Sequence, residues 1–163
     1  MLTLSEARAI NEIARRYPAR ANAGAEALSI VQRSRGWIPD ELLADTAAHV
    51  NMSAAELDSV ATFYNRIYRR PVGKHVILLC GSVSCWIMGK DSLRDYLLKS
   101  LGLKFVGDTT IDGLFTLLDG VCLGACDLSP AMMLDNVLHG NLTQAKIDSL
   151  IAECRNSPAE SGE

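Results

Sequence analysis

The chain has 163 residues, of which 48% are hydrophobic and 21% charged, and its formal net charge is −3. This composition is ordinary for a globular protein, and the length fits one domain or two small ones. The charge balance, without a basic stripe, argues against nucleic acid as a partner. No apolar run approaches the length of a membrane span, and the N-terminus lacks a basic region followed by an apolar core. We therefore expect neither direct membrane insertion nor a signal peptide.

Residues 1–70 predict four helices and form a candidate N-terminal helical domain. Two of these helices open with a capping box, in which a Ser or Thr and a Glu three residues later bond to each other's backbone amides. The pattern occurs at Thr3/Glu6 and again at Ser53/Glu56. The other two helices are expected over about residues 21–35 and from about residue 40.

Two aromatic residues are expected to help fill the interior of this helical domain. Trp37 follows Gly36, which suits the end of the second helix, and a large indole could fill a small core; a role at an interface is the alternative. Tyr64 falls on the apolar face of the fourth helix. No residue of the domain suggests chemistry of its own.

The pattern of apolar residues changes from helical to strand-like after residue 70 and marks a second domain, residues 71–155. Pro71-Val72-Gly73 interrupts the helical pattern, and the apolar run His75–Leu79 predicts a strand buried on both faces. A helix, a strand, a two-stranded hairpin and a final helix are then expected over about residues 91–101, 115–118, 131–139 and 142–154. The polar segment 156–163 contains Pro and Gly and predicts a disordered tail. The chain is therefore expected to be an α+β protein in two parts.

Four of the five cysteines form two close pairs, C80-x4-C85 and C122-x3-C126. Each pair follows a predicted strand, and sites in open α/β sheets gather at the carboxyl ends of strands, so the two cysteine loops should meet. Four thiolates are the full ligand set of a [2Fe–2S] cluster, a [4Fe–4S] cluster or a structural zinc.

The spacing within the pairs favours a [2Fe–2S] cluster among these alternatives. Zinc knuckles and thioredoxin-like redox pairs use C-x2-C, whereas C-x4-C occurs in plant-type [2Fe–2S] ferredoxins. A [4Fe–4S] cluster is less favoured because the chain has no C-x2-C-x2-C run. A Rieske centre is less favoured because all three His residues lie outside the pairs. Two disulfides or buried structural pairs are the alternative without metal. Cys154 lies on an apolar helical face and is expected to be a packing residue.

The cysteine pattern is one of several motifs that follow one another along the chain as they do in a known protein family. The others are RGWIPD (residues 35–40), VATFY (60–64), PVGKH (71–75), DGLFTL (112–117) and the Pro130/Met132 pair. Together these motifs resemble the NuoE-type subunit of bacterial respiratory complex I, over about residues 3–153. The resemblance implies a thioredoxin-like α/β domain with one [2Fe–2S] cluster held by Cys80, Cys85, Cys122 and Cys126.

The resemblance also implies an electron-transfer role within a larger enzyme, NADH-quinone oxidoreductase, which couples NADH oxidation to quinone reduction and proton translocation. A [2Fe–2S] centre passes single electrons and cannot accept a hydride, so FMN is expected in a partner chain. The implied partners are the FMN- and NADH-binding flavoprotein subunit and the larger iron–sulfur subunit. The implied location is the peripheral arm, on the cytoplasmic side of the inner membrane. The equivalent diaphorase subunit of an NAD-linked hydrogenase or formate dehydrogenase is the alternative.

Three further expectations accompany the resemblance. Trp86, directly after Cys85, is expected to pack under the cysteine loop; the alternative is that it shields the cluster or contacts the flavoprotein. A hydroxyl at Ser129 could donate a hydrogen bond towards a cluster sulfur and raise the reduction potential. The helical domain, which carries no chemistry of its own, is expected to dock the chain on the flavoprotein.

Overall fold

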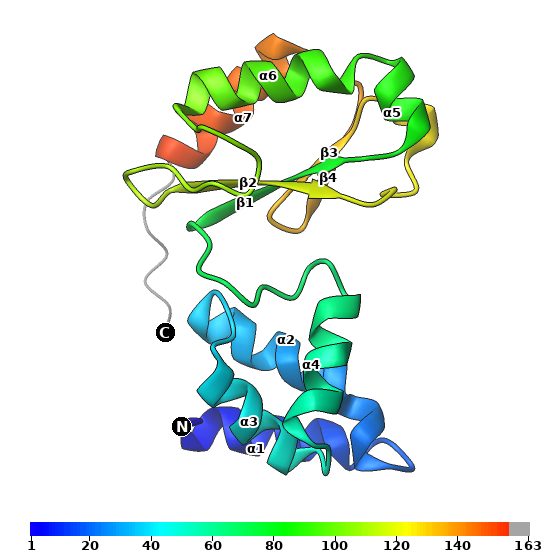
Figure 1. Cartoon of the computed structure of the whole chain (residues 1–163), viewed down its shortest axis with the longest axis vertical. Helices are drawn as coiled ribbons and strands as arrows, with labels where there is room; N and C mark the ends of the chain where they lie inside the picture. Colours follow the sequence, from blue (N-terminus) through cyan, green and yellow to red (C-terminus); the bar gives the residue numbers. More distant parts are fainter. Residues whose placement is uncertain (157–163) are drawn as a thin grey trace. The chain divides into compact units, whose positions relative to one another are not determined.

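The computed structural model describes residues 1–156, which form two compact units, Met1–Pro71 and a second unit that begins at Val72 (Figure 1). Each unit has a buried core of its own. Of the predicted tail, Asn156 is the last residue of a helix rather than part of a loose end, and residues 157–163 lie outside the described part of the chain. Within residues 1–156, no helix is both long and apolar enough to cross a lipid bilayer.

The described residues of the first unit form four α-helices and one short 3-10 helix. Their bounds are α1 Leu4–Ala14, η1 Arg20–Ala23, α2 Gly24–Arg35, α3 Asp40–His49 and α4 Ala54–Phe63. Both predicted capping boxes are formed, because the side chains of Thr3 and Ser53 each accept a hydrogen bond from the backbone amide of the Glu three residues later. Helix α2 begins later than predicted because the residues before it wind as the 3-10 turn η1.

The core of the first unit is built from small and medium apolar side chains. Its fully buried members include Ile10, Ala14, Ala27, Leu28, Val31, Ile38, Val50, Leu57 and Ala61. Both aromatic predictions for this unit are wrong. Trp37 is only half-buried, and its neighbour Ile38 occupies the interior instead, because helices separated by Ala and Leu leave no space for an indole. Tyr64 follows the last turn of α4 with an extended backbone, so it leaves the apolar face and is 48% exposed.

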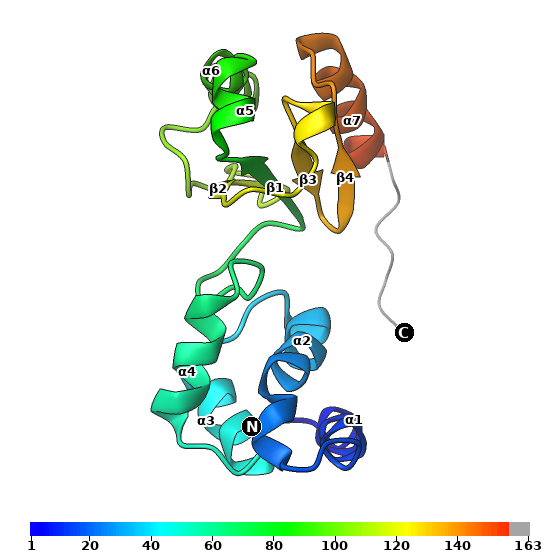
Figure 2. The same ribbon diagram turned by 90° about the vertical axis from the view of Figure 1, so that its right-hand side faces the viewer.

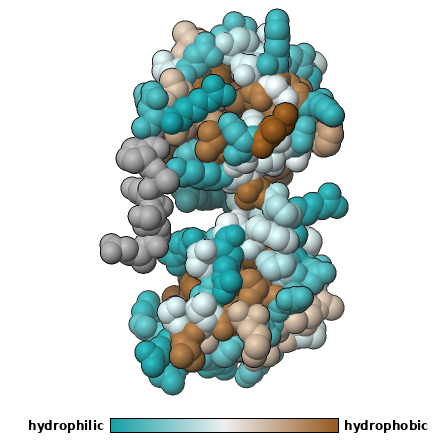
Figure 3. Space-filling view, turned by 90° about the vertical axis from the view of Figure 1, so that its left-hand side faces the viewer, coloured by the Kyte–Doolittle hydropathy of each residue, from teal (hydrophilic) through white to brown (hydrophobic). Residues whose placement is uncertain are grey.

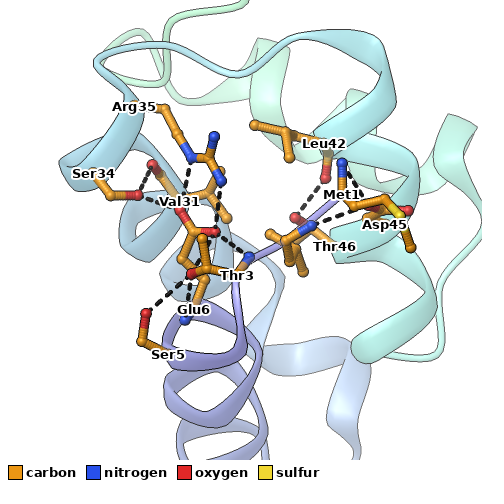
Figure 4. Close-up of polar contacts among 11 residues, drawn as sticks. Met1, Thr3, Ser5, Glu6, Val31, Ser34, Arg35, Leu42, Asp45 and Thr46 are labelled. Carbon is orange, nitrogen blue, oxygen red and sulfur yellow. Dashed lines mark hydrogen bonds and ion pairs between the residues drawn. The ribbon is translucent and has the colours of Figure 1, made fainter.

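A buried carboxylate joins the first turn of α1 to the last turn of α2. Glu6, 5% exposed, accepts hydrogen bonds from the Arg35 guanidinium at 2.9 and 3.1 Å, from the Thr3 amide at 2.7 Å and from the Ser34 hydroxyl (Figure 4). Arg35 is the main cause that holds the pKa of Glu6 far below its usual range, although burial acts in the opposite direction. The charged form of this carboxylate is therefore part of the folded unit.

The second unit is a mixed four-stranded sheet with helices against it (Figures 1 and 2). Its strands are β1 His75–Cys80, β2 Phe115–Gly120, β3 Met132–Leu134 and β4 Val137–His139. Its helices are α5 Val83–Ile87, α6 Lys90–Leu101, the 3-10 turn η2 Cys126–Leu128 and α7 Gln144–Asn156. The strand order is β2-β1-β3-β4. Strand β1 pairs parallel with β2 and antiparallel with β3, and β3 pairs antiparallel with β4.

Alternate residues of the strands face helices α6 and α7. This core contains Ile77, Leu79, Phe115, Leu117, Met132 and Leu134 from the sheet, and Leu93, Leu97, Leu101, Ile147 and Ile151 from the helices. The predicted strands and long helices are present near their expected positions. The element that the sequence did not predict is α5, which lies inside the segment expected to be an open cysteine loop.

The surface carries apolar side chains among hydrophilic ones. Figure 3 shows this mixture on one face, where brown residues interrupt the teal and white surface of each unit. Exposed large side chains outside the cysteine region include Leu4, Phe63, Phe105 and Ile111. Single exposed apolar residues are common in soluble proteins, so only their grouping near a site carries meaning.

The Glu6 contact predicts a pH-dependent stability. Glu6→Gln should lower the free energy of unfolding by about 2 kcal/mol, because Arg35 and Ser34 lose a charged acceptor. The pKa of Glu6 is lowered in the folded state from its ordinary value of 4.5, so its contribution is full above that value and is lost as the pH falls towards the folded pKa. Urea unfolding followed by far-UV circular dichroism should show a wild-type advantage that is constant above about pH 5 and shrinks below it.

Glu12→Gln is the matched control on the same helix. Glu12 pairs with Arg16 at 3.0 Å, but both side chains are largely exposed, and exposed ion pairs contribute little. The control should therefore change stability much less. Equal losses in the two variants would contradict the importance assigned to the buried Glu6 contact.

Candidate iron–sulfur site

The parallel pairing of β1 and β2 brings the two cysteine loops to one end of the sheet. In this register Cys80 lies opposite Gly120, so the two strands end together. The pairing extends one residue further, because the Gly81 amide donates a hydrogen bond to the Gly120 carbonyl at 2.9 Å. Cys122 follows two residues after the end of β2. The loops thus leave the sheet side by side, as expected for the carboxyl ends of parallel strands.

This close approach requires glycine at both strand ends. A Cβ atom at residue 81 would collide with the carbonyl oxygen of Gly120, and a Cβ atom at residue 120 would lie 2.8 Å from the side chain of Leu78. Neither contact has room for a side chain. Gly81 and Gly120 therefore set the spacing between the two loops.

Helix α5 returns Cys85 to the sheet. Ser82 caps this helix, and its hydroxyl oxygen accepts a hydrogen bond from the Cys85 amide at 3.4 Å. Cys85 is consequently 1% exposed and Cys80 is 2% exposed. The two thiols form a small buried cluster with Ala125 and Ala131.

The second pair differs from the first because both of its cysteines are exposed. The Sγ atoms of Cys122 and Cys126 are 3.8 Å apart, and both thiols are free. The Gly124 amide donates to the Cys122 sulfur at 3.5 Å, with Gly124 in the left-handed region at φ +78°. The site therefore has one buried and one exposed pair of thiols.

Contacts between the loops join the two pairs. The Leu123 amide of the second loop donates to the Cys80 sulfur, which also contacts the Ser82 hydroxyl at 3.5 Å. Burial raises the pKa of the Cys80 thiol, but these hydrogen bonds, with smaller help from Cys85, outweigh it and lower the pKa to about 7. A lowered pKa favours the thiolate, which is the form that binds metal.

The pKa of the Cys126 thiol is raised, in contrast to that of Cys80. A hydrogen bond with the Ser84 hydroxyl favours the thiolate, but the nearby Cys122 and, more weakly, Cys80 oppose a further negative charge. Repulsion of this kind between neighbouring thiolates is neutralised where cations bind. The raised pKa therefore reflects the closeness of the two thiols of the exposed pair.

Cys154 lies apart from these four residues. It is on α7, half-buried against the core between the sheet and the long helices. Burial is the main cause that raises the pKa of its thiol, and Asp135 and Glu153 add to the effect. Its surroundings are those of a packing residue.

Among the side chains of residues 1–156, no three His, Cys, Asp or Glu residues are grouped so that they could hold one metal ion. A [2Fe–2S] cluster is bound by two thiolates at each of its two irons. The residues that could hold such a cluster are the two thiol pairs, whose loops are in contact.

Exposed apolar side chains border the cysteines. Four of them lie in or directly after α5. They are Val83, Trp86, Ile87 and Met88, whose exposures are 67%, 60%, 70% and 59%. The expectation that Trp86 packs under the loop is therefore wrong. Successive helical residues point about 100° apart, so a helix that turns Cys85 inward turns the next residue outward. Val121, beside the second pair, is also exposed.

Comparison with known protein families identifies the family of this chain. Residues 10–155 match the family model of the thioredoxin-like [2Fe–2S] ferredoxins. The chain belongs to this family. The resemblance noted in the sequence is thereby confirmed, and so is the preference for a [2Fe–2S] cofactor over zinc or [4Fe–4S].

Individual relatives extend this likeness over nearly the whole chain. The chain is 43% identical over 150 residues to the NuoE-type subunits of the NADH-quinone oxidoreductases of Escherichia coli (strain K12) and Salmonella typhimurium, covering 92% of this chain and 90% of each relative. It is 39% identical over 151 residues to the corresponding Pseudomonas aeruginosa protein, covering 93% of this chain and 90% of the relative.

Solved structures add a likeness of fold. An NAD⁺-reducing [NiFe]-hydrogenase in the air-oxidised state matches with a TM-score of 0.70 and 21% identity, over 86% of this chain and 24% of that chain. At this identity the match speaks for the fold alone.

Sequence reasoning missed the roles of Ser82 and Ser84 and the helix that contains Ser84. A signal was present, because Ser82 precedes Cys85 by three residues, which is the spacing between a helix N-cap and the amide it accepts from. The small residues between the two cysteines instead suggested an open loop. Small size does not distinguish a loop from one turn of a capped helix.

The glycine contact between the loops can be tested directly. Gly81→Ala should lower the free energy of unfolding by about 1–3 kcal/mol, because the added methyl group meets backbone that cannot move aside freely. It should also lower the iron and acid-labile sulfide that the chain retains after anaerobic reconstitution. Metal and sulfide analysis per chain provides the measurement.

Gly102→Ala is the comparison variant. Gly102 ends α6 with φ +68°, but an added Cβ atom would meet nothing there. It should lose about 1–2 kcal/mol from its left-handed backbone alone and keep the full iron content. A full iron content in both variants would show that the Gly81–Gly120 contact is not needed for the site.

Proposed function

We propose that the chain is the [2Fe–2S] electron-transfer subunit of an NADH-quinone oxidoreductase, with Cys80, Cys85, Cys122 and Cys126 as the cluster ligands. The observation that carries this proposal is the meeting of the two thiol pairs at one end of the sheet. Cys154, the remaining cysteine, lies apart from them, half-buried against the core of the second unit. The likeness to NuoE-type relatives over 90% of their length supports the same role.

The two cysteine pairs would hold the cluster from opposite sides. When bound, a [2Fe–2S] cluster supplies one-electron redox chemistry. Cys80 and Cys85 would hold it on the buried side, where Ala125 and Ala131 limit the access of water. Cys122 and Cys126 would hold it on the exposed side, from which an electron can pass to another protein. The Leu123 amide donates to the Cys80 sulfur of the other loop. The Gly124 amide donates to the Cys122 sulfur of its own loop.

The chemistry of the cluster requires a partner with a flavin. A one-electron centre cannot take a hydride from NADH, so a flavin must first divide the electron pair. We propose the FMN- and NADH-binding flavoprotein subunit as the direct partner and the larger iron–sulfur subunit as a further neighbour. In this role the chain is part of the peripheral arm on the cytoplasmic side of the inner membrane. Quinone reduction and proton translocation belong to the assembly.

A second candidate is the diaphorase part of an NAD-linked hydrogenase, since the same fold occurs in an NAD⁺-reducing [NiFe]-hydrogenase. Sequence identity weighs against it. The chain is 43% identical to NuoE-type relatives of similar length, but 21% identical to the hydrogenase chain, of which it covers 24%. We therefore prefer the quinone-linked assembly.

We propose that residues 1–70, nearly all of the first unit, are a four-helix domain that docks the chain on its flavoprotein partner. The family match begins at residue 10 and so includes most of these helices. An open hollow of about 470 Å³ lies against α2 and α4, and its lining includes Phe63 and Tyr64. Phe63 is 80% exposed and packs edge-on against Tyr64 at 5.2 Å between ring centroids. Exposed paired aromatics of this kind are typical of interfaces.

The ligand assignment predicts a clear difference among cysteine variants. Reconstituted wild-type chain should carry two irons and two acid-labile sulfides and give an EPR signal on reduction. Cys122→Ser should lose or strongly distort this signal, because a ligand is replaced by a poorer one. Cys154→Ser should keep the iron content and the spectrum. Similar behaviour of the two variants, or a colourless protein with stoichiometric zinc, would contradict the assignment.

The docking proposal predicts which surface residue the partner needs. Tagged wild-type chain, expressed in its native cell, should co-purify with a flavoprotein of a quinone-reducing complex. Phe63→Ser should weaken that association at least about tenfold, since exposed aromatic anchors contribute strongly to binding. Affinity purification with quantitative mass spectrometry measures the partner retained by each variant.

Ile111→Ser is the matched control for this experiment. Ile111 is fully exposed but precedes β2, at the end of the sheet opposite the cysteines. It should retain the partner as the wild type does. Undiminished binding by Phe63→Ser would overturn the docking role of the helices, and recovery of hydrogenase subunits would favour the second candidate.

A further inference from the structure

Serine hydroxyls contact three of the four cysteine sulfurs of the site. The contacts join Ser82 to Cys80, Ser84 to Cys126 and Ser129 to Cys85. In the first and last of these contacts the oxygen and sulfur atoms are 3.5 Å apart, a normal distance for a hydrogen bond that involves sulfur. The serines come from two loops that are far apart in the sequence. The contacts of Ser84 and Ser129 therefore depend on the meeting of the two loops, whereas the contact of Ser82 with Cys80 lies within one loop.

The Ser82 hydroxyl is oriented by its capping role. Its oxygen accepts the Cys85 amide at 3.4 Å. A hydroxyl has one proton to donate and lone pairs to accept with, so acceptance of the amide leaves the proton free to point at Cys80. The Cys80 thiol donates to this oxygen, but when Cys80 is a thiolate its sulfur can only accept, and the hydroxyl becomes the donor. The cap of α5 thus also supplies a donor to a cysteine sulfur.

The Ser129 hydroxyl is buried beside the cysteines. Ser129 is 8% exposed, and its oxygen lies 2.9 Å from the Cys126 carbonyl oxygen and 3.5 Å from the Cys85 sulfur. With Cys85 as a thiol, the Ser129 hydroxyl donates to that carbonyl and accepts from the Cys85 thiol. When Cys85 is a thiolate, its sulfur can only accept, and the hydroxyl proton can be shared between the two acceptors. A donor held in a site of low dielectric interacts more strongly with a charged acceptor than it would in water. Ser129 therefore responds to the charge on Cys85.

We infer that Ser82 and Ser129 raise the reduction potential of the cluster above the value that the backbone amides alone would give. This inference rests on the proposed ligand set. One-electron reduction adds one negative charge, which is shared by the ligand sulfurs, and hydrogen-bond donors to those sulfurs favour the more negative state. Ser84 adds a similar donor at the exposed pair, where water weakens its effect. The serines thus make the cluster a better electron acceptor.

Alanine and threonine variants of the full-length chain test this role. In anaerobic redox titrations of reconstituted protein followed by EPR, Ser129→Ala and Ser82→Ala should each hold less reduced cluster at a fixed ambient potential. We expect the ratio of reduced to oxidised cluster to fall by about three- to tenfold, where tenfold equals about 59 mV for a one-electron couple. Ser129→Thr and Ser82→Thr keep a hydroxyl and should stay close to the wild-type ratio.

Ser100→Ala is the matched control within the same unit. The Ser100 hydroxyl bonds to the Leu97 carbonyl at the far end of α6, so its removal should leave the potential unchanged. Unchanged potentials in both Ser82→Ala and Ser129→Ala, with intact clusters, would overturn the inference and leave the ligand set standing. Since the two positions are independent, loss of the cluster in one variant leaves the other to decide. A wild-type chain without a [2Fe–2S] spectrum would overturn the proposed function instead.

Discussion

The parallel pairing of β1 with β2 is the interaction on which the site depends. It places Cys80 opposite Gly120 and ends both strands at the same height, so that two loops 40 residues apart in sequence leave the sheet together. The remaining features refine this arrangement. Gly81 and Gly120 let the backbones touch, and the capped helix α5 turns Cys85 inward. A shift of one residue in this register would turn the side chain of Cys80 to the other face of the sheet.

Much of this arrangement could be predicted from the sequence because its signals are local. Both capping boxes, the buried strand at β1 and the hairpin through Asp135 depend on residues close together in the chain, and all are present. The cysteine pairs could also be grouped in advance, because both follow strands of the same sheet. These predictions rested on short-range sequence patterns and on the rule that sites gather at the carboxyl ends of the strands of a sheet.

What the sequence did not reveal depends on side-chain direction and on competition for space. Trp37 and Ile38 are adjacent apolar residues, and only the packed helices decide that the smaller one is buried. Trp86 points outward because the neighbouring Cys85 points inward within one helical turn. The contact of Ser84 with the Cys126 sulfur joins residues distant in sequence, and spacing alone contains no trace of it.

The two cysteines of each pair are close in sequence, but the two pairs are far apart in sequence. The segments Cys80–Cys85 and Cys122–Cys126 span six and five residues, so a disordered chain can bring each pair together without much loss of entropy. All four thiols come together only after the long crossover between β1 and β2 has closed. A group that binds all four therefore recognises the native chain alone, and its binding free energy is added to the stability of the fold. Occupancy of the site and the folding equilibrium of the second unit are in this way thermodynamically linked.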